Sequence, residues 1–146
     1  MRTIKHTDFH VLLVEDNEGD IILTLEAFEE NKITCDVSVV KDGKEALDYV
    51  FHQGKYKSTA PPDLILLDIN LPKKNGLEVL QQIKERDRTK HIPIIVLTTS
   101  TSKNDVMAAY QNYANCYITK PMDLNSFIQA ISRIENFWLD IATLPH

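Results

Sequence analysis

Three short and almost entirely apolar segments recur along this chain, and each ends in an acid or a hydroxyl. They are FHVLLVED at residues 9–16, DLILLD at residues 63–68 and IPIIVLT at residues 92–98. Segments of this length without polar alternation are typical of strands buried on both faces, as in a parallel sheet covered by helices. The rest of the chain must therefore supply helices for both faces of a sheet.

The segments between these strands have the helical spacing that this requirement needs. Two further strands are expected at CDVSVV (35–40) and CYITKP (116–121), and a helix is expected after each of the five strands. The first two expected helices occupy residues 18–31 and 43–52. The other three begin near Gly76, Ser102 and Asp123, and Ser102 and Asp123 are expected to cap their helices. Five strand–helix units with right-handed crossovers predict an α/β fold with a doubly wound, five-stranded parallel sheet. The polar residues 52–62 predict a long exposed loop.

Length and composition limit the function classes. The chain has 146 residues, enough for one domain, and a formal net charge of −5 with no basic cluster, which argues against direct nucleic-acid binding. No apolar segment reaches membrane-spanning length, and the N-terminus has no signal-type apolar region. Cys35 and Cys116 are too few for a disulfide framework or a zinc site. A cytoplasmic protein with no membrane partner is expected.

The polar residues at the strand ends are the candidate site. In an open α/β sheet, ligands bind beyond the carboxyl ends of the strands. The first predicted strand brings Glu15 and Asp16 there, the third brings Asp68, the fourth Thr98 and the fifth Lys120. We therefore expect three carboxylates, a hydroxyl and an ammonium group at one edge of the sheet.

This set of groups suits one kind of chemistry. Clustered carboxylates repel one another, and the pKa of at least one of them rises unless a cation compensates their charge. Mg²⁺ prefers oxygen ligands of this kind. An aspartate can also act as a nucleophile and form an aspartyl phosphate, and phosphoryl transfer depends mainly on positioning and charge neutralisation. The sequence predicts a Mg²⁺-dependent phosphoryl site in which Asp68 is the acceptor and Lys120 and Thr98 bind phosphoryl oxygens.

Four motifs in this order resemble the receiver domain of bacterial two-component response regulators, a CheY-like fold. The motifs are VEDN (14–17), LLDINLP (66–72) followed by NG (75–76), VLTTS (96–100) and YITKP (117–121). The resemblance covers residues 9–135 and leaves an N-terminal arm, 1–8, and a C-terminal extension, 136–146. It implies the flavodoxin-like strand order 2-1-3-4-5 and phosphorylation by a sensor histidine kinase.

The resemblance assigns the acceptor and the cation site residue by residue. Asp68 matches the phosphoacceptor, and Lys120 matches the lysine that faces it. Glu15 and Asp16 match the acidic pair that holds Mg²⁺ together with Asp68, and the backbone carbonyl of Asn70 is a further ligand. The acidic pair is Glu-Asp here rather than the commoner Asp-Asp, a frequent variant that leaves the assignment intact.

The resemblance also implies a switch. Thr98 matches the hydroxyl that moves onto the phosphoryl group, and Tyr117 matches the aromatic residue that turns inward in response. Asn70 and Ser100 occupy the variable positions that tune the lifetime of the acyl phosphate. The family usually has a cis peptide bond before the proline at position 121.

Two departures from a minimal receiver point to a subgroup. The loop 52–62 is long, and the tail 135–146 contains Phe137, Trp138 and Leu139. Both features resemble the response regulators paired with cyanobacterial phytochrome kinases, which implies light-controlled phosphorylation and homodimerisation. We expect the dimer to use this tail and the face formed by residues 103–134.

Some of these residues also fit other functions. Alone, Glu15 and Asp16 would be helix-capping acids, and Tyr117 would be an ordinary core or surface aromatic. A phosphatase of the haloacid-dehalogenase type would also use an aspartate, but it carries a second aspartate two residues later, where this chain has Asn70. A phosphorylation-independent adaptor usually lacks the acceptor or the lysine, and both are present. We expect no enzyme of metabolism, but a switch that catalyses only its own phosphoryl transfer and dephosphorylation. Because no DNA-binding region follows residue 134, its output is expected to pass through another protein.

Overall fold

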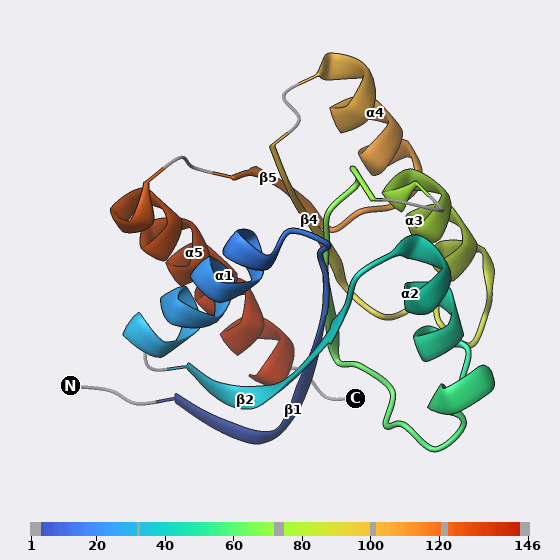
Figure 1. Ribbon diagram of the computed structural model, residues 1–146, viewed down its shortest axis with the longest axis horizontal. Helices are drawn as coiled ribbons and strands as arrows, with labels where there is room; N and C mark the ends of the chain where they lie inside the picture. Colours follow the sequence, from blue (N-terminus) through green and yellow to red (C-terminus); the bar gives the residue numbers. More distant parts are fainter. Residues whose placement is uncertain (1–3, 32, 72–74, 100–101, 121–122, 144–146) are drawn as a thin grey trace.

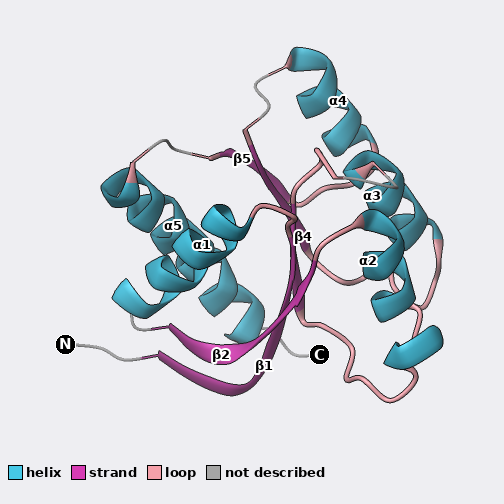
Figure 2. Cartoon of the chain, in the orientation of Figure 1, coloured by secondary structure: helices cyan, strands magenta, loops and turns pink. Residues whose placement is uncertain are grey.

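The computed structural model describes residues 4–31, 33–71, 75–99, 102–120 and 123–143. A five-stranded parallel sheet in the order β2-β1-β3-β4-β5 lies between two layers of helices (Figures 1 and 2). The strands are β1 (Ile4–Val14), β2 (Ile33–Val40), β3 (Leu64–Leu67), β4 (Ile94–Thr98) and β5 (Cys116–Thr119). The predicted doubly wound α/β fold and the strand order 2-1-3-4-5 are confirmed.

The five helices divide between the two faces of the sheet. Helices α1 (Glu18–Glu30) and α5 (Leu124–Thr143) lie side by side on one face, and α2 (Gly43–Val50), α3 (Gly76–Glu85) and α4 (Lys103–Gln111) lie on the other (Figure 1). The central strand β3 shows why its sequence is uniformly apolar. Leu64 and Leu66 pack into the α1–α5 side of the core, whereas Ile65 and Leu67 pack into the α2–α3 side. All four are fully buried, so the strand has no face on which a polar residue is tolerated.

The helix starts follow the capping signals in the sequence. The Ser102 side chain accepts a hydrogen bond from the Asp105 N–H at the start of α4, and the Asp123 carboxylate accepts one from the Ser126 N–H at the start of α5. Both predicted caps are confirmed. The hydrogen bonds to Ser126 hold the pKa of the Asp123 carboxyl below its usual value.

The first strand and the last helix are both longer than predicted. Strand β1 begins at Ile4 rather than at residue 9, because residues 4–6 pair with residues 33–35 before a register shift between His6 and His10. Most of the expected arm 1–8 therefore belongs to the sheet. Helix α5 continues to Thr143 because neither glycine nor proline interrupts it. Much of the expected extension 136–146 is thus helix. Within the described parts of the chain, no helix is both long and apolar enough to cross a membrane.

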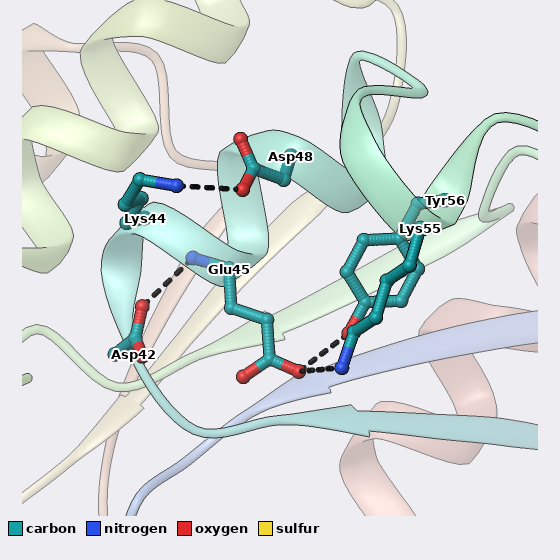
Figure 3. A pocket seen from close by; sticks show the side chains of 6 residues that line it. All are labelled: Asp42, Lys44, Glu45, Asp48, Lys55 and Tyr56. Atoms are coloured by element: carbon teal, nitrogen blue, oxygen red, sulfur yellow. Dashed lines mark hydrogen bonds and ion pairs between the residues drawn. The ribbon is translucent and has the colours of Figure 1, made fainter.

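The long loop after α2 contains a short 3₁₀ helix, η1 (Gly54–Tyr56), which the sequence did not predict. Figure 3 shows how it is held. The Tyr56 hydroxyl donates a hydrogen bond of 2.5 Å to the Glu45 carboxylate on α2, and Lys55 lies 3.9 Å from the same carboxylate. The Tyr56 ring also packs 4.9 Å from that of Tyr49. The start of the loop is therefore fixed to α2. The pocket between η1 and α2 is lined by charged and polar side chains that pair with one another, such as Lys44 with Asp48 (Figure 3).

Candidate functional site

Asp68 lies immediately after β3 and is the centre of the candidate site. Its side chain is only 9% exposed. Oδ1 accepts hydrogen bonds from the Thr98 hydroxyl at 2.7 Å and from the Asn70 N–H at 3.0 Å, and Oδ2 lies 3.1 Å from the Lys120 ammonium. The predicted hydroxyl, Thr98, and the predicted lysine, Lys120, therefore both contact the carboxylate of the predicted acceptor, Asp68.

Lys120 follows β5, and the backbone fixes its position because its N–H donates to the Thr98 carbonyl at 2.7 Å. Its side chain is 4% exposed, and its ammonium donates to the carboxylates of Glu15, Asp20 and Asp68. Asp20 was not predicted. As an acid in the first turn of α1, it matches an ordinary stabilising position at a helix N-terminus, and no spacing in the sequence links it to residue 120.

Burial and charge shift the ionisation of this cluster. Burial, and to a lesser degree the nearby charge of Asp68, raises the pKa of the Glu15 carboxyl to about 7, although Lys120 opposes this shift. Burial also disfavours the charged form of Lys120. The hydrogen bonds to Glu15 and Asp20 and the charges of Asp68 and Glu15 outweigh this effect, so the pKa of the lysine lies above its usual value.

Three carboxylates fit the predicted cation site. Each of Glu15, Asp16 and Asp68 offers an oxygen, and these oxygens lie within 4.8 Å of one another. Glu15 and Asp68 are buried, whereas Asp16 is exposed and gives access from solvent. Among the residues that the structure describes, no other group of three histidine, cysteine or acidic side chains is arranged in this way. A hard, oxygen-only donor set is the one that Mg²⁺ prefers.

The start of α3 packs closely against the backbone of Asp68 and Ile69. Gly76 donates its N–H to the Ile69 carbonyl at 3.0 Å. A Cβ atom at position 76 would collide with the Asp68 carbonyl oxygen and the Ile69 Cα. The NG pair at 75–76 is therefore tied to the position of Asp68: Asn75 caps the helix by accepting from the Leu77 N–H at 2.7 Å, and glycine leaves room for the acceptor loop.

The remaining predicted residues lie around this centre. Thr98 is fully buried, and the exposed Asn70 donates its side-chain amide to the Thr98 hydroxyl at 3.4 Å. Tyr117 on β5 is half-buried, packs against the α2–α3 side of the core, and donates its N–H to the Tyr110 hydroxyl at 3.2 Å. Ser100 and Pro121, with the peptide bond before that proline, lie outside the described residues.

The chain matches known proteins over most of its length. Residues 11–132 match the response regulator receiver domain family. The response regulator Rcp1 of Synechocystis sp. is 43% identical over 135 residues, which is 92% of each chain.

Solved structures agree with this match. The phosphorylated cyanobacterial phytochrome response regulator RcpA superposes with a TM-score of 0.88 at 46% identity, covering 94% of this chain and 99% of that one. A Mn²⁺-bound form of Rcp1 superposes with a TM-score of 0.87 at 42% identity and the same coverage. The predicted fold family is thus confirmed, and the chain is a receiver-domain response regulator related to the cyanobacterial phytochrome response regulators.

Proposed function

We propose that this protein is a phosphorylation switch whose acceptor is Asp68 and whose phosphoryl transfer depends on Mg²⁺. The observation that carries the proposal is the environment of the Asp68 carboxylate. It is buried at a strand end, accepts from a hydroxyl on one oxygen, faces an ammonium with the other, and shares a cation-sized cluster with Glu15 and Asp16.

Each of these groups has a role in the proposed transfer. The Asp68 carboxylate, which faces the Lys120 ammonium, attacks the phosphorus of a phosphohistidine; the new O–P bond forms as the P–N bond breaks, and the imidazole leaves with the electron pair. Lys120 and the Thr98 hydroxyl are placed to bind phosphoryl oxygens. A bound Mg²⁺ would be held by Glu15, Asp16, Asp68 and the Asn70 carbonyl and would neutralise charge on the phosphoryl group.

The proposed output is a change in partner binding. Thr98 donates to Asp68 in this structure. A phosphoryl group would offer it a new acceptor, and Tyr117, which is half-buried on the adjoining strand, is the proposed responding residue. Asn70 and Ser100 are the proposed determinants of acyl-phosphate lifetime. The protein would catalyse only its own phosphorylation and dephosphorylation and would not turn over a metabolite.

The proposed kinase is a sensor histidine kinase of the phytochrome type. The support is the kinship with Rcp1 and RcpA, which extends along nearly the whole chain. A cytoplasmic location is also part of the proposal, and the two free cysteines, Cys35 and Cys116, support it. Comparing transfer from a phytochrome-type kinase with transfer from an unrelated histidine kinase tests this choice, and equal rates would remove its basis.

A homodimer is part of the proposal. The continuous helix α5 carries the apolar tail beyond residue 134, next to the proposed 103–134 face. Sedimentation of the full chain and of a chain ending at Glu135 tests the tail. We expect a dimer for the full chain and a monomer for the shortened one, and an unchanged dimer would exclude the tail from the interface.

Intact mass spectrometry after incubation with acetyl phosphate and Mg²⁺ tests the acceptor. We expect one Mg²⁺-dependent phosphoryl adduct on the wild type and none on Asp68→Asn. Asp63→Asn is the matched control, since Asp63 immediately precedes the same strand. Its carboxylate accepts a hydrogen bond from the backbone N–H of His10 at 2.8 Å, and no other partner is found for it among the residues that the structure describes. The control should take up the phosphoryl group like the wild type.

Two other functions predict different results. A phosphorylation-independent adaptor would give no adduct on the wild type. A phosphatase would release phosphate from free phosphoesters with many turnovers. The completeness of the Asp68, Thr98 and Lys120 set weighs against the adaptor, and the position of the acceptor after the third strand, with Asn70 two residues later, weighs against the phosphatase.

A further inference from the structure

Asp20 contacts the site lysine but stands outside the carboxylate cluster. Its Oδ2 lies 2.9 Å from the Lys120 ammonium, and its side chain is 31% exposed. The first turn of α1 is well fixed around it: the Asp20 N–H donates to the Asn17 side chain at 2.9 Å, and the Asp20 carbonyl accepts from the Thr24 hydroxyl at 2.7 Å. Asp20 is therefore held at the rim of the site.

Lys120 shares two of its three partners with the cation site. An ammonium has three N–H donors, and here they go to Glu15, Asp20 and Asp68. Glu15 and Asp68 belong to the group whose oxygens lie within 4.8 Å of one another, together with Asp16, whereas Asp20 does not. A divalent cation in that group would compete with the ammonium for Glu15 and Asp68 and would also repel it.

These contacts give Asp20 a distinct role. We propose that Asp20 is a positioning residue that retains Lys120 in the site when a divalent cation occupies the Glu15–Asp16–Asp68 cluster. The lysine then gives up part of its bonding to Glu15 and Asp68 but keeps a carboxylate partner, so cation entry costs less and both positive groups stay beside Asp68. The use of this arrangement in phosphoryl transfer rests on the proposed function, but the effect of Asp20 on cation affinity can be measured without phosphorylation.

Calorimetric titration with Mn²⁺ and with Mg²⁺ tests the proposal through a double-mutant cycle of Asp20→Asn and Lys120→Met. We expect Asp20→Asn to weaken cation affinity about three- to tenfold when Lys120 is present. In the Lys120→Met background, where no ammonium needs a partner, the same substitution should change the affinity by less than about twofold. An equal loss in both backgrounds would show that Asp20 acts only as a nearby negative charge, and no loss in either would remove its role; both results overturn the proposal.

A control in the same helical turn separates position from charge. Glu18→Gln removes an acid from the first turn of α1 whose partner is Lys41 rather than Lys120. It should leave cation affinity within about twofold of the wild type, because exposed charges are screened. If Lys120→Met does not fold, this comparison still decides the matter, since a loss with Glu18→Gln as large as that with Asp20→Asn would overturn the proposal.

The outcomes also separate this inference from the proposed function. Normal phosphoryl adducts on the wild type with unchanged cation affinity in Asp20→Asn would overturn the role of Asp20 alone. Tight cation binding that depends on Asp20 only when Lys120 is present, without any adduct on Asp68, would overturn the proposed function alone.

Discussion

Lys120 should be the main electrostatic support of the folded site. The Lys120→Met substitution keeps an unbranched side chain of similar length but deletes the positive charge. The Glu15 and Asp68 carboxylates then remain buried without the Lys120 ammonium, which contacts both of them in the wild type. Removal of one partner from a buried ion pair typically costs about 3 to 5 kcal/mol. The remaining repulsion is of the same order: two unit charges at the 4.8 Å limit of this cluster repel by about 3.5 kcal/mol at an effective dielectric constant of about 20.

The cost should depend on pH in a definite direction. The pKa of Glu15 is raised to about 7 by burial even with Lys120 present, and loss of Lys120 raises it further. A carboxyl group with a raised pKa in the folded state binds more protons there than in the unfolded chain, so stability falls as pH rises. We expect a loss of about 3 to 5 kcal/mol at about pH 8.5 and less than about 2 kcal/mol at about pH 5.5, where Glu15 is protonated.

Urea unfolding in the presence of a metal chelator measures both values. Lys84→Met is the matched control. Lys84 is partly buried, and that burial lowers its pKa, but its ammonium donates to the carbonyls of Lys90 and Ile92 and to the Asn115 side chain rather than to carboxylates. The free energy of unfolding of Lys84→Met should not depend more strongly on pH than that of the wild type. A loss below about 1 kcal/mol for Lys120→Met at about pH 8.5, or a loss of equal size at both pH values, would refute the reasoning.

Three further predictions concern the scaffold. Gly76→Ala should destabilise the protein by about 1 to 3 kcal/mol and slow adduct formation on Asp68, because the new Cβ collides with the backbone of Asp68 and Ile69. In the control Gly19→Ala the new Cβ meets only the Asn17 side chain, at 3.2 Å, so the free energy of unfolding in urea should change by less than about 1 kcal/mol. Equal effects of the two substitutions would contradict the collision. Phe127→Ala should cost about 3 to 5 kcal/mol in the same assay, since Phe127 is fully buried between α5 and the sheet; a cost under about 1 kcal/mol would mean that the cavity collapses. Burial, and to a lesser degree the charge of Asp36, raises the pKa of the Cys35 thiol to about 12, so in a Cys116→Ser protein at about pH 8 it should react with a disulfide reagent at least about a hundredfold more slowly than free cysteine; a rate near that of free cysteine would rule out this burial.

Local patterns in the sequence were sufficient for the layers of the fold and for most of the site. LILL at 64–67 lacks any polar residue and so specifies a strand covered on both faces, and Ser102 and Asp123 mark helix starts because their side chains satisfy free N–H groups. The strand ends brought Glu15, Asp68 and Lys120 to one edge of the sheet for the same reason: parallel strands share a direction, so residues at their carboxyl ends become neighbours.

Other features depend on contacts between distant parts of the chain. Residues 4–6 are strand because residues 33–35 pair with them, and η1 forms where Tyr56 reaches Glu45 on α2. In both cases the two partners are too far apart in the sequence to fall within one segment of the length of a helix turn or a strand, so no local pattern predicts the contact.

The sequence by itself determined which elements form and which side chains stand at the strand ends, because these follow from periodicity and capping within about a dozen residues. Only the tertiary structure decided that Asp20 meets Lys120 across 100 positions, that Gly76 must leave space for Asp68, and that Glu15 has a pKa of about 7. These properties arise from burial and close approach between separate elements, which the packed chain creates and no local pattern encodes.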